Sequence, residues 1–157
     1  MASNQDEKGA AVKFPPPLIF IICMLLGYLL NYFFPWQVGA SSLVVYCGVA
    51  LVLLSLGSVL YLSRVFNRLR THIEPWKPTS AIISSGLYGY SRNPIYVAFA
   101  VITIGVGLIA NNLWISLSFL PAIMGVYFVA IKKEEAYLSD KFGEKYLNYK
   151  NKVRRWF

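Results

Sequence analysis

The sequence predicts an all-α integral membrane protein, a bundle of four transmembrane helices with a cytoplasmic loop and a C-terminal amphipathic helix covering a site. Two observations predict this fold class. Apolar residues make up 57% of the 157 residues, and the mean hydropathy is +0.52, more than a soluble domain of this size normally carries. Four long stretches also contain no Asp, Glu, Lys, Arg or His.

Each uncharged stretch is expected to form one transmembrane helix, and the four lie at residues 17–34, 41–62, 95–110 and 113–131. At ~1.5 Å per residue the first covers about 27 Å, close to the hydrocarbon thickness of a bilayer. Pro121 is expected to kink the fourth helix. Gly105 and Gly107 are interpreted as small residues that allow close helix packing, because no strand precedes them as a dinucleotide-binding motif requires.

The basic residues indicate the orientation in the membrane. Of the 15 Lys and Arg, two precede the first span, five lie in residues 63–93, and eight follow the fourth span. By the positive-inside rule, both termini, the central loop and the active site are cytoplasmic. The net charge of +8 therefore favours membrane lipids as partners over nucleic acid, and no obligate protein partner is indicated.

The chain is expected to form a single membrane domain over residues 14–157, preceded by a polar, disordered tail over residues 1–13. An interfacial helix is expected over about residues 134–157, with Gly143 as a candidate hinge. Its apolar residues recur at spacings of three and four: Leu138, Phe142, Tyr146, Tyr149, Val153 and Trp156.

Two short motifs border the cytoplasmic ends of the last two spans. Asn93 and Pro94 suit the N-cap and first position of a helix, and beside Arg92 such a helix start can also seat a carboxylate or phosphate. Glu134 and Glu135 follow the fourth span. Either neighbouring lysines neutralise these carboxylates, or one of them binds the ammonium, sulfonium or hydroxyl groups of a ligand. A metal site is not expected, because His72 is the only histidine.

Taken together, these motifs resemble the isoprenylcysteine carboxyl methyltransferase family. The resemblance covers roughly residues 64–157 and rests on Ala-Ile-Ile-Ser-Ser-Gly-Leu-Tyr at 81–88, Arg-Asn-Pro-Ile-Tyr at 92–96, the Glu pair, and Phe-Gly-Glu-Lys-Tyr at 142–146. Asn-Pro-x-Tyr followed by a Glu pair also resembles phospholipid N-methyltransferases. The chain departs from the first family at Asn93, where many members have His, and at Ala130, where eukaryotic members have Arg.

The resemblance implies an S-adenosylmethionine-dependent methyltransferase with a lipid-like acceptor, such as an isoprenylcysteine-type carboxylate. Phosphatidylethanolamine-type N-methylation is the alternative within the same chemistry. The resemblance assigns cofactor contacts to Ile82, Ile83, Tyr88, Asn93, Pro94, Tyr96 and Glu134. Arg92, Glu134 and Glu135 are the candidate catalytic residues, since Arg92 suits a carboxylate acceptor and a glutamate suits deprotonation of an amine.

Three other classes of protein share features with this sequence. A proton-coupled transporter normally carries ionisable residues within its spans, and this chain has none there. A sterol-reductase-like enzyme shares an aromatic and basic C-terminal tail, but the short chain and the Glu pair disfavour it. A non-catalytic membrane scaffold remains the alternative from another class, although it has no need for paired motifs on two cytoplasmic segments.

Overall fold

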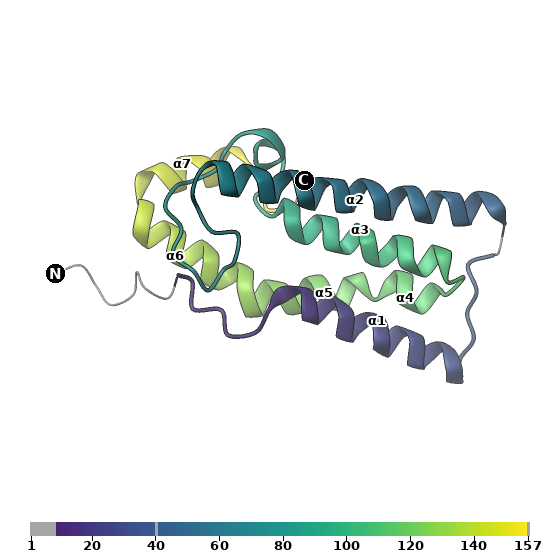
Figure 1. The fold of residues 1–157 in the computed structure, drawn as a ribbon. Helices are drawn as coiled ribbons and strands as arrows, with labels where there is room; N and C mark the ends of the chain where they lie inside the picture. The colour runs from purple at the N-terminus through teal and green to yellow at the C-terminus, as the bar shows by residue number, and fades with distance from the viewer. Residues whose placement is uncertain (1–8, 40, 157) are drawn as a thin grey trace. The chain divides into compact units, whose positions relative to one another are not determined.

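The computed structural model describes residues 9–39 and 41–156, and the regular secondary structure in this part of the chain is all helical, with no strand. The elements in order are α1 (Pro16–Phe33), α2 (Ser42–Arg68), the 3-10 helix η2 (Gly86–Gly89), α3 (Pro94–Ile109), α4 (Leu113–Leu117), α5 (Phe119–Val126), the π-helix η3 (Tyr127–Ile131), α6 (Lys132–Phe142) and α7 (Glu144–Lys152) (Figure 1). The predicted all-α class is confirmed.

The chain divides into two compact units. Unit 1 comprises Met1–Pro15, Leu60–Pro94 and Tyr127–Phe157. Unit 2 comprises Pro16–Val59 and Ile95–Val126. All Asp, Glu, Lys and Arg residues of the sequence belong to unit 1, and unit 2 has none.

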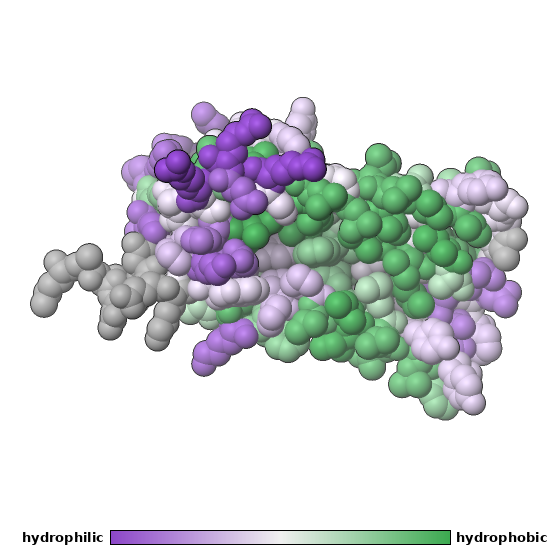
Figure 2. All heavy atoms as spheres, in the orientation of Figure 1, coloured by the Kyte–Doolittle hydropathy of each residue, from purple (hydrophilic) through white to green (hydrophobic). Residues whose placement is uncertain are grey.

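Three helical runs are long and apolar enough to cross a membrane: Pro16–Phe33, Ser42–Arg68 and Leu113–Phe142. The predicted third span appears as Pro94–Ile109, an apolar helix of 16 residues. Hydrophobic side chains cover the helices of unit 2 (Figure 2), and Leu25 and Leu54 are 63% and 71% exposed. Since such surfaces are stable in lipid and not in water, the chain is a membrane protein.

Two predicted helix ends are placed differently in the structure. Helix α2 continues to Arg68 instead of ending at residue 62, and the fourth helical run continues past residue 131 to Phe142. No Gly or Pro interrupts either extension. Glu134 and Glu135 therefore lie in the first turn of α6 and not at a helix C-terminus, as the sequence had suggested.

The predicted C-terminal helix is interrupted at Gly143, where α6 ends and α7 begins. Gly143 has φ +50° and ψ −130°, a combination that only glycine adopts readily. The helical segment ends at Lys152 and not near residue 157, and residues 153–156 are not helical.

The predicted irregularity at Pro121 is present as a break at Ser118 between α4 and α5. Proline has no N–H for the carbonyl four residues earlier, and that carbonyl belongs to Leu117, the last residue of α4. At the break, the Ser118 hydroxyl donates to the carbonyl oxygen of Ile115 at 2.7 Å.

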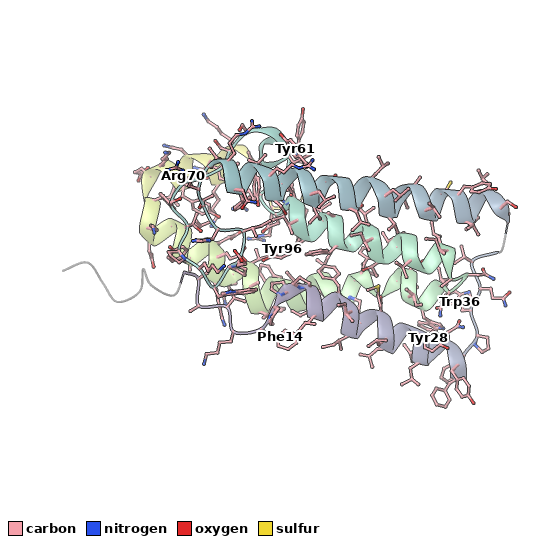
Figure 3. The ribbon with its side chains drawn as sticks, in the orientation of Figure 1. Phe14, Tyr28, Trp36, Tyr61, Arg70 and Tyr96 are labelled. Atoms are coloured by element: carbon pink, nitrogen blue, oxygen red, sulfur yellow. The ribbon has the colours of Figure 1, made fainter. Side chains whose placement is uncertain are left out.

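Glycines bring the helices of unit 2 close together, as the sequence predicted for Gly105 and Gly107. A Cβ on Gly105 would lie 2.8 Å from the carbonyl oxygen of Gly48 on α2, and a Cβ on Gly107 would overlap Ser116. Helix α1 packs against α4 and α5. The connection that follows α1 contributes Trp36 (Figure 3), whose ring meets that of Trp114 at 5.4 Å.

In unit 1, hydrogen bonds hold the loop between α2 and η2. The Thr79 N–H donates to the Tyr137 hydroxyl at 3.2 Å, and the Ala10 N–H donates to the carbonyl oxygen of Pro75 at 3.0 Å. Val12 is 3% exposed. Of the tail predicted over residues 1–13, residues 1–8 lie outside the described part of the chain. Residues 9–13 are described, and they include the hydrogen-bonded Ala10 and the buried Val12.

Candidate functional site

Ser91, Arg92 and Asn93 form a short buried segment of unit 1 between η2 and α3. Ser91 and Asn93 are 4% and 7% exposed. The Asn93 N–H donates to the Ser91 hydroxyl at 3.1 Å, and the Asn93 side-chain NH2 donates to the carbonyl oxygen of Arg155 at 3.1 Å. This turn fixes the direction in which Arg92 leaves the backbone.

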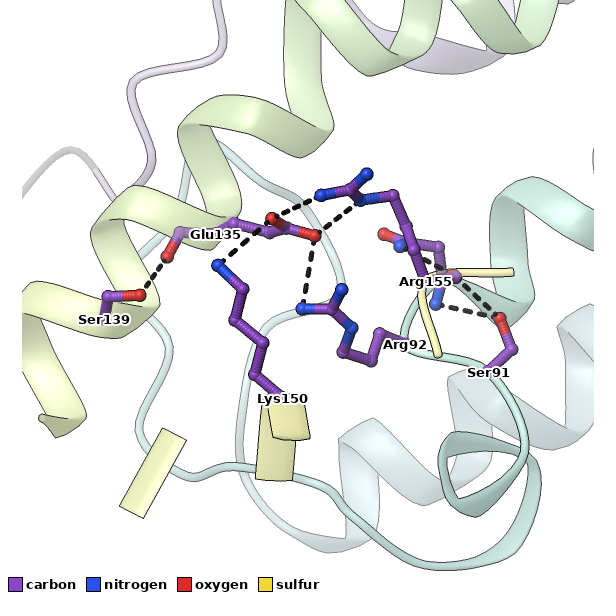
Figure 4. Close-up of polar contacts among 7 residues, drawn as sticks. Ser91, Arg92, Glu135, Ser139, Lys150 and Arg155 are labelled. Atoms are coloured by element: carbon purple, nitrogen blue, oxygen red, sulfur yellow. Dashed lines mark hydrogen bonds and ion pairs between the residues drawn. The ribbon is translucent and has the colours of Figure 1, made fainter. Parts of the chain in front are cut away.

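The Glu135 carboxylate of α6 lies at the centre of a group of cations in unit 1 (Figure 4). Arg155 donates to both of its oxygens, from Nε at 2.9 Å and from Nη2 at 3.1 Å. Arg92 Nη1 lies 3.3 Å and Lys150 Nζ lies 3.7 Å from the same carboxylate. One carboxylate thus faces three cations, so the cluster keeps an excess of positive charge.

Arg92 is the buried member of this cluster. Its side chain is only 8% exposed, whereas Arg155 and Lys150 are 34% and 38% exposed. Among the described residues its Nε is buried without a hydrogen-bond partner, and Nη1 has the ion pair with Glu135 but no well-aligned hydrogen bond. Because buried guanidinium donors are normally satisfied, this atom suits an acceptor supplied by a ligand.

Tyrosines connect this cluster to η2. The Tyr149 hydroxyl donates to the carbonyl oxygen of Tyr88 at 2.7 Å, and the Tyr88 ring lies 5.9 Å from that of Phe66. Burial raises the pKa of the Tyr88 phenol, and the negative charge of Glu134 raises it further. Glu134 therefore acts electrostatically on Tyr88, which the resemblance assigns to the same site.

Two further pKa shifts reflect the same arrangement. The pKa of Arg155 is raised, chiefly by its hydrogen bond to Glu135. The pKa of the Tyr146 phenol is raised by burial and by the charge of Glu135, with an opposing contribution from Arg92. Arg155, Glu135, Arg92 and Tyr146 thus form one electrostatic unit.

The predicted site residues fall into two sets. Unit 1 contains Ile82, Ile83, Tyr88, Arg92, Asn93, Pro94, Glu134 and Glu135. Within it, Ile83 is 8% exposed in the loop before η2, and Pro94 is the first residue of α3. Tyr96 belongs to unit 2, where it is 8% exposed on α3. Its place in the site stays a prediction, as do the roles of the others.

Arg155, Lys150 and Ser91 belong to this cluster or contact it, and the sequence alone does not predict this. A buried carboxylate needs a cation, but eight Lys and Arg follow the fourth span, and their spacing does not single out a partner for Glu135. His72 is a surface residue of the loop, with Nδ1 at 4.0 Å from the Glu74 carboxylate.

The fold and this cluster define an all-helical membrane protein with buried charge gathered in one unit. The model of the phospholipid methyltransferase family matches residues 43–145, about two thirds of the chain. The chain belongs to this family, whose chemistry implies a methyl donor. The matched segment runs from α2 through α6 and stops before Tyr146.

Two curated relatives carry the name protein-S-isoprenylcysteine O-methyltransferase. The Schizosaccharomyces pombe protein is 33% identical over 72 residues, 46% of this chain and 30% of its own length. The Saccharomyces cerevisiae protein is 33% identical over 85 residues, 53% of this chain and 36% of its own length. The chain thus spans about a third of these relatives. An uncharacterized Haemophilus influenzae protein is 44% identical over 54 residues, 31% of this chain and 86% of its own length.

Proposed function

We propose that this chain is an S-adenosylmethionine-dependent methyltransferase that methylates the carboxylate of a lipid-like, isoprenylcysteine-type acceptor. Family membership and the names of the two yeast relatives support the reaction class. The observation that carries the proposal is Arg92, a buried guanidinium with an unsatisfied Nε, in the same unit as the Glu pair.

The residues of unit 1 fit the proposed cofactor. S-Adenosylmethionine carries a carboxylate, an ammonium, a sulfonium and an adenosine, and when bound it supplies an electrophilic methyl group. Arg92 Nε offers a donor for the carboxylate, and Glu134 offers negative charge for a cationic group. Ile82, Ile83 and Tyr88 provide apolar and aromatic side chains. Pro94 begins α3, and Asn93 immediately precedes it. This chemistry matches the cofactor group by group.

The charge balance favours a carboxylate acceptor. In methyl transfer to a carboxylate, an O–C bond forms as the C–S bond breaks, and the charges of sulfonium and carboxylate disappear together. No proton has to be removed, so alignment and exclusion of water suffice. The cluster of Arg92, Lys150 and Arg155 around Glu135 attracts an anionic acceptor and repels an ammonium.

Phospholipid N-methylation is the second candidate, because the matching family model bears that name. A phosphatidylethanolamine amine must lose a proton before attack, and Glu134 is then the better base. Glu135 already accepts two hydrogen bonds from Arg155 and faces two further cations, so it binds a proton poorly. We assign Glu135 to the positioning of Arg92 and Arg155.

The proposed topology has four spans, with both termini and the site on the cytoplasmic side. Helix α3, at 16 residues, covers about 24 Å, a few ångströms less than the ~30 Å hydrocarbon core, so in this topology the bilayer thins locally around it. The confinement of every charged residue to unit 1 supports this orientation by the positive-inside rule. In this proposal residues 14–157 act as one membrane domain, and α6 with α7 forms the interfacial amphipathic segment over the site.

The decisive experiment measures S-adenosylmethionine binding by calorimetry to the protein in lipid nanodiscs. We expect the parent to bind and Glu134→Ala to bind roughly 10- to 100-fold more weakly, as loss of a charge-assisted contact implies. Glu144→Ala, which removes an exposed carboxylate from α7, is the matched control and should bind like the parent.

Binding is followed by transfer of a labelled methyl group to a farnesylcysteine derivative or to phosphatidylethanolamine in the disc. Transfer to the carboxylate supports the first candidate, and transfer to the amine supports the second. A folded parent that binds no S-adenosylmethionine contradicts both and favours the scaffold.

A further inference from the structure

Helix α2 is longer than its apolar part. Residues 43–62 carry no charged side chain, and at ~1.5 Å per residue they cover about 30 Å, the thickness of a hydrocarbon core. By the same measure, Arg64 lies about 3 Å and Arg68 about 9 Å beyond this apolar part. The headgroup layer adds about 5–8 Å on each side of the core, so the end of α2 lies at the depth of the lipid phosphates.

One face of this end of α2 changes from apolar to basic within a turn. Leu60, Arg64 and Arg68 follow one another at a spacing of four, so they lie on one side of the helix, and all three are exposed. Leu60 is 58% exposed, and Tyr61 beside it is 49% exposed. Leucine, then tyrosine, then arginine is the order in which side chains meet the acyl chains, the interface and the phosphates of a phospholipid.

Arg70 extends this basic surface past the helix end (labelled, with Tyr61, in Figure 3). Its N–H donates to the carbonyl oxygen of Asn67, and the Thr71 N–H donates to that of Phe66, both at 3.1 Å. This pair of bonds places Arg70 at the position after a helix where glycine is usual. Its φ is +50°, a left-handed conformation that disfavours a residue with a Cβ. The backbone here therefore favours glycine, yet the position holds an exposed arginine.

The three guanidiniums are not neutralised by the part of the chain that the structure describes. Within residues 9–39 and 41–156, no ion pair or hydrogen bond involves the side chain of Arg64, Arg68 or Arg70. Residues 63–73 contain no Asp or Glu, and the next carboxylate, Glu74, accepts from Lys77 Nζ at 2.7 Å. The end of α2 thus presents three positive charges next to exposed apolar surface.

We propose that Arg64, Arg68 and Arg70 bind the phosphate groups of anionic phospholipids, with the acyl chains lying against Leu60. Guanidiniums bind phosphate oxygens through paired hydrogen bonds, and each basic residue near an anionic membrane surface contributes roughly a fivefold preference for it. A lipid uses both the charge and the apolar face, whereas a soluble anion uses the charge alone. The inference is independent of the proposed function, because it requires only that the chain lies in a membrane.

The first test identifies the lipids that stay with the protein in native mass spectrometry after its release from nanodiscs of equal parts phosphatidylglycerol and phosphatidylcholine. We expect the parent to retain phosphatidylglycerol in roughly threefold excess or more, and Arg64→Gln/Arg68→Gln to retain it in roughly 1.5-fold excess or less. Lys145→Gln/Lys152→Gln removes the same charge from exposed positions of α7. This matched control should keep the preference of the parent.

The second test uses Arg70→Gly, which separates lipid binding from the stability of the fold. In phosphatidylcholine discs its Tm should equal that of the parent or exceed it by up to about 3 °C, because glycine relieves the left-handed conformation. Adding phosphatidylglycerol to the discs should raise the Tm of the parent more than that of Arg70→Gly. If Arg70 served only to end the helix, both proteins would gain equally.

The proposal is overturned if the parent shows no preference for phosphatidylglycerol, or if Arg64→Gln/Arg68→Gln keeps the preference as fully as the α7 control. Equal gains of the parent and Arg70→Gly from phosphatidylglycerol would exclude Arg70 from the site. Inorganic phosphate added to phosphatidylcholine discs should leave the Tm of the parent unchanged. If it raises the Tm as much as phosphatidylglycerol does, the surface binds free anions and the lipid proposal fails.

Discussion

Removal of the Glu135 carboxylate is the perturbation whose energetic cost follows most directly from the structure. Glu135→Ala leaves three cations without their shared anion. Arg155 and Lys150 are 34% and 38% exposed and can turn to water, so each contributes at most about 1 kcal/mol. Arg92 is 8% exposed, and breaking a buried pair on one side costs about 3–5 kcal/mol.

We therefore expect Glu135→Ala to lower the free energy of unfolding by about 3 kcal/mol, roughly 6–12 °C in Tm for a chain of this size. Thermal unfolding in nanodiscs or detergent, followed by circular dichroism, measures this difference. Glu144→Ala, at an exposed position of α7, is the matched control and should change Tm by about 2 °C or less.

The double variant Arg92→Ala/Glu135→Ala tests the reason for the loss. If the cost of Glu135→Ala is the uncompensated charge of Arg92, the double variant is more stable than the sum of the two single effects predicts. Additive losses, or a Tm for Glu135→Ala within 2 °C of the parent, would refute the reasoning.

Two further predictions concern helix packing and tyrosine burial. Gly107→Ala should destabilise the protein by about 1–3 kcal/mol in thermal unfolding, because the new methyl group overlaps Ser116 of a neighbouring helix. Gly57→Ala is the control: a Cβ at this position has nothing within 4 Å, so this variant should be as stable as the parent or up to ~1 kcal/mol more stable. Equal effects of the two substitutions would contradict this packing. Burial raises the pKa of Tyr88 and Tyr149, so the unfolded chain loses these protons near pH 10 while the folded one keeps them. Stability should therefore fall as pH rises above about 10, and Tyr88→Phe should weaken the fall; a Tm that is constant between pH 9 and 11 would argue against the buried phenol.

The extent of agreement between sequence and structure differs from element to element. The helix predicted over residues 17–34 is α1, Pro16–Phe33. The prediction is accurate because these residues form an uncharged apolar run that is followed by Pro35. The start of α3 at Pro94 was equally predictable, since proline suits the first helical position. In both cases the signal lies within a few neighbouring residues.

The errors occur where local signals are weak. The first charged residue after an apolar run marks where a helix leaves the lipid, but a charged residue does not end a helix. Helix α2 therefore continues to Arg68, and the helical run after residue 131 continues through α6. The predicted interfacial helix was divided by Gly143, whose positive φ depends on how α6 and α7 pack. Periodicity alone continues across this glycine.

The sequence by itself determined the helical class, the apolar runs and the family motifs, because hydropathy and residue order are properties of short stretches of chain. Only the tertiary structure decided that Glu135 pairs with Arg155, 20 residues further along, and that Arg92 is buried beside Glu135 with no hydrogen-bond partner for its Nε. The physical reason is that eight Lys and Arg residues follow the fourth span, and the sequence does not distinguish which of them pair with the Glu135 carboxylate. Their distances and burial, which arise only when the chain folds back on Ser91–Asn93, decide which of them bind it.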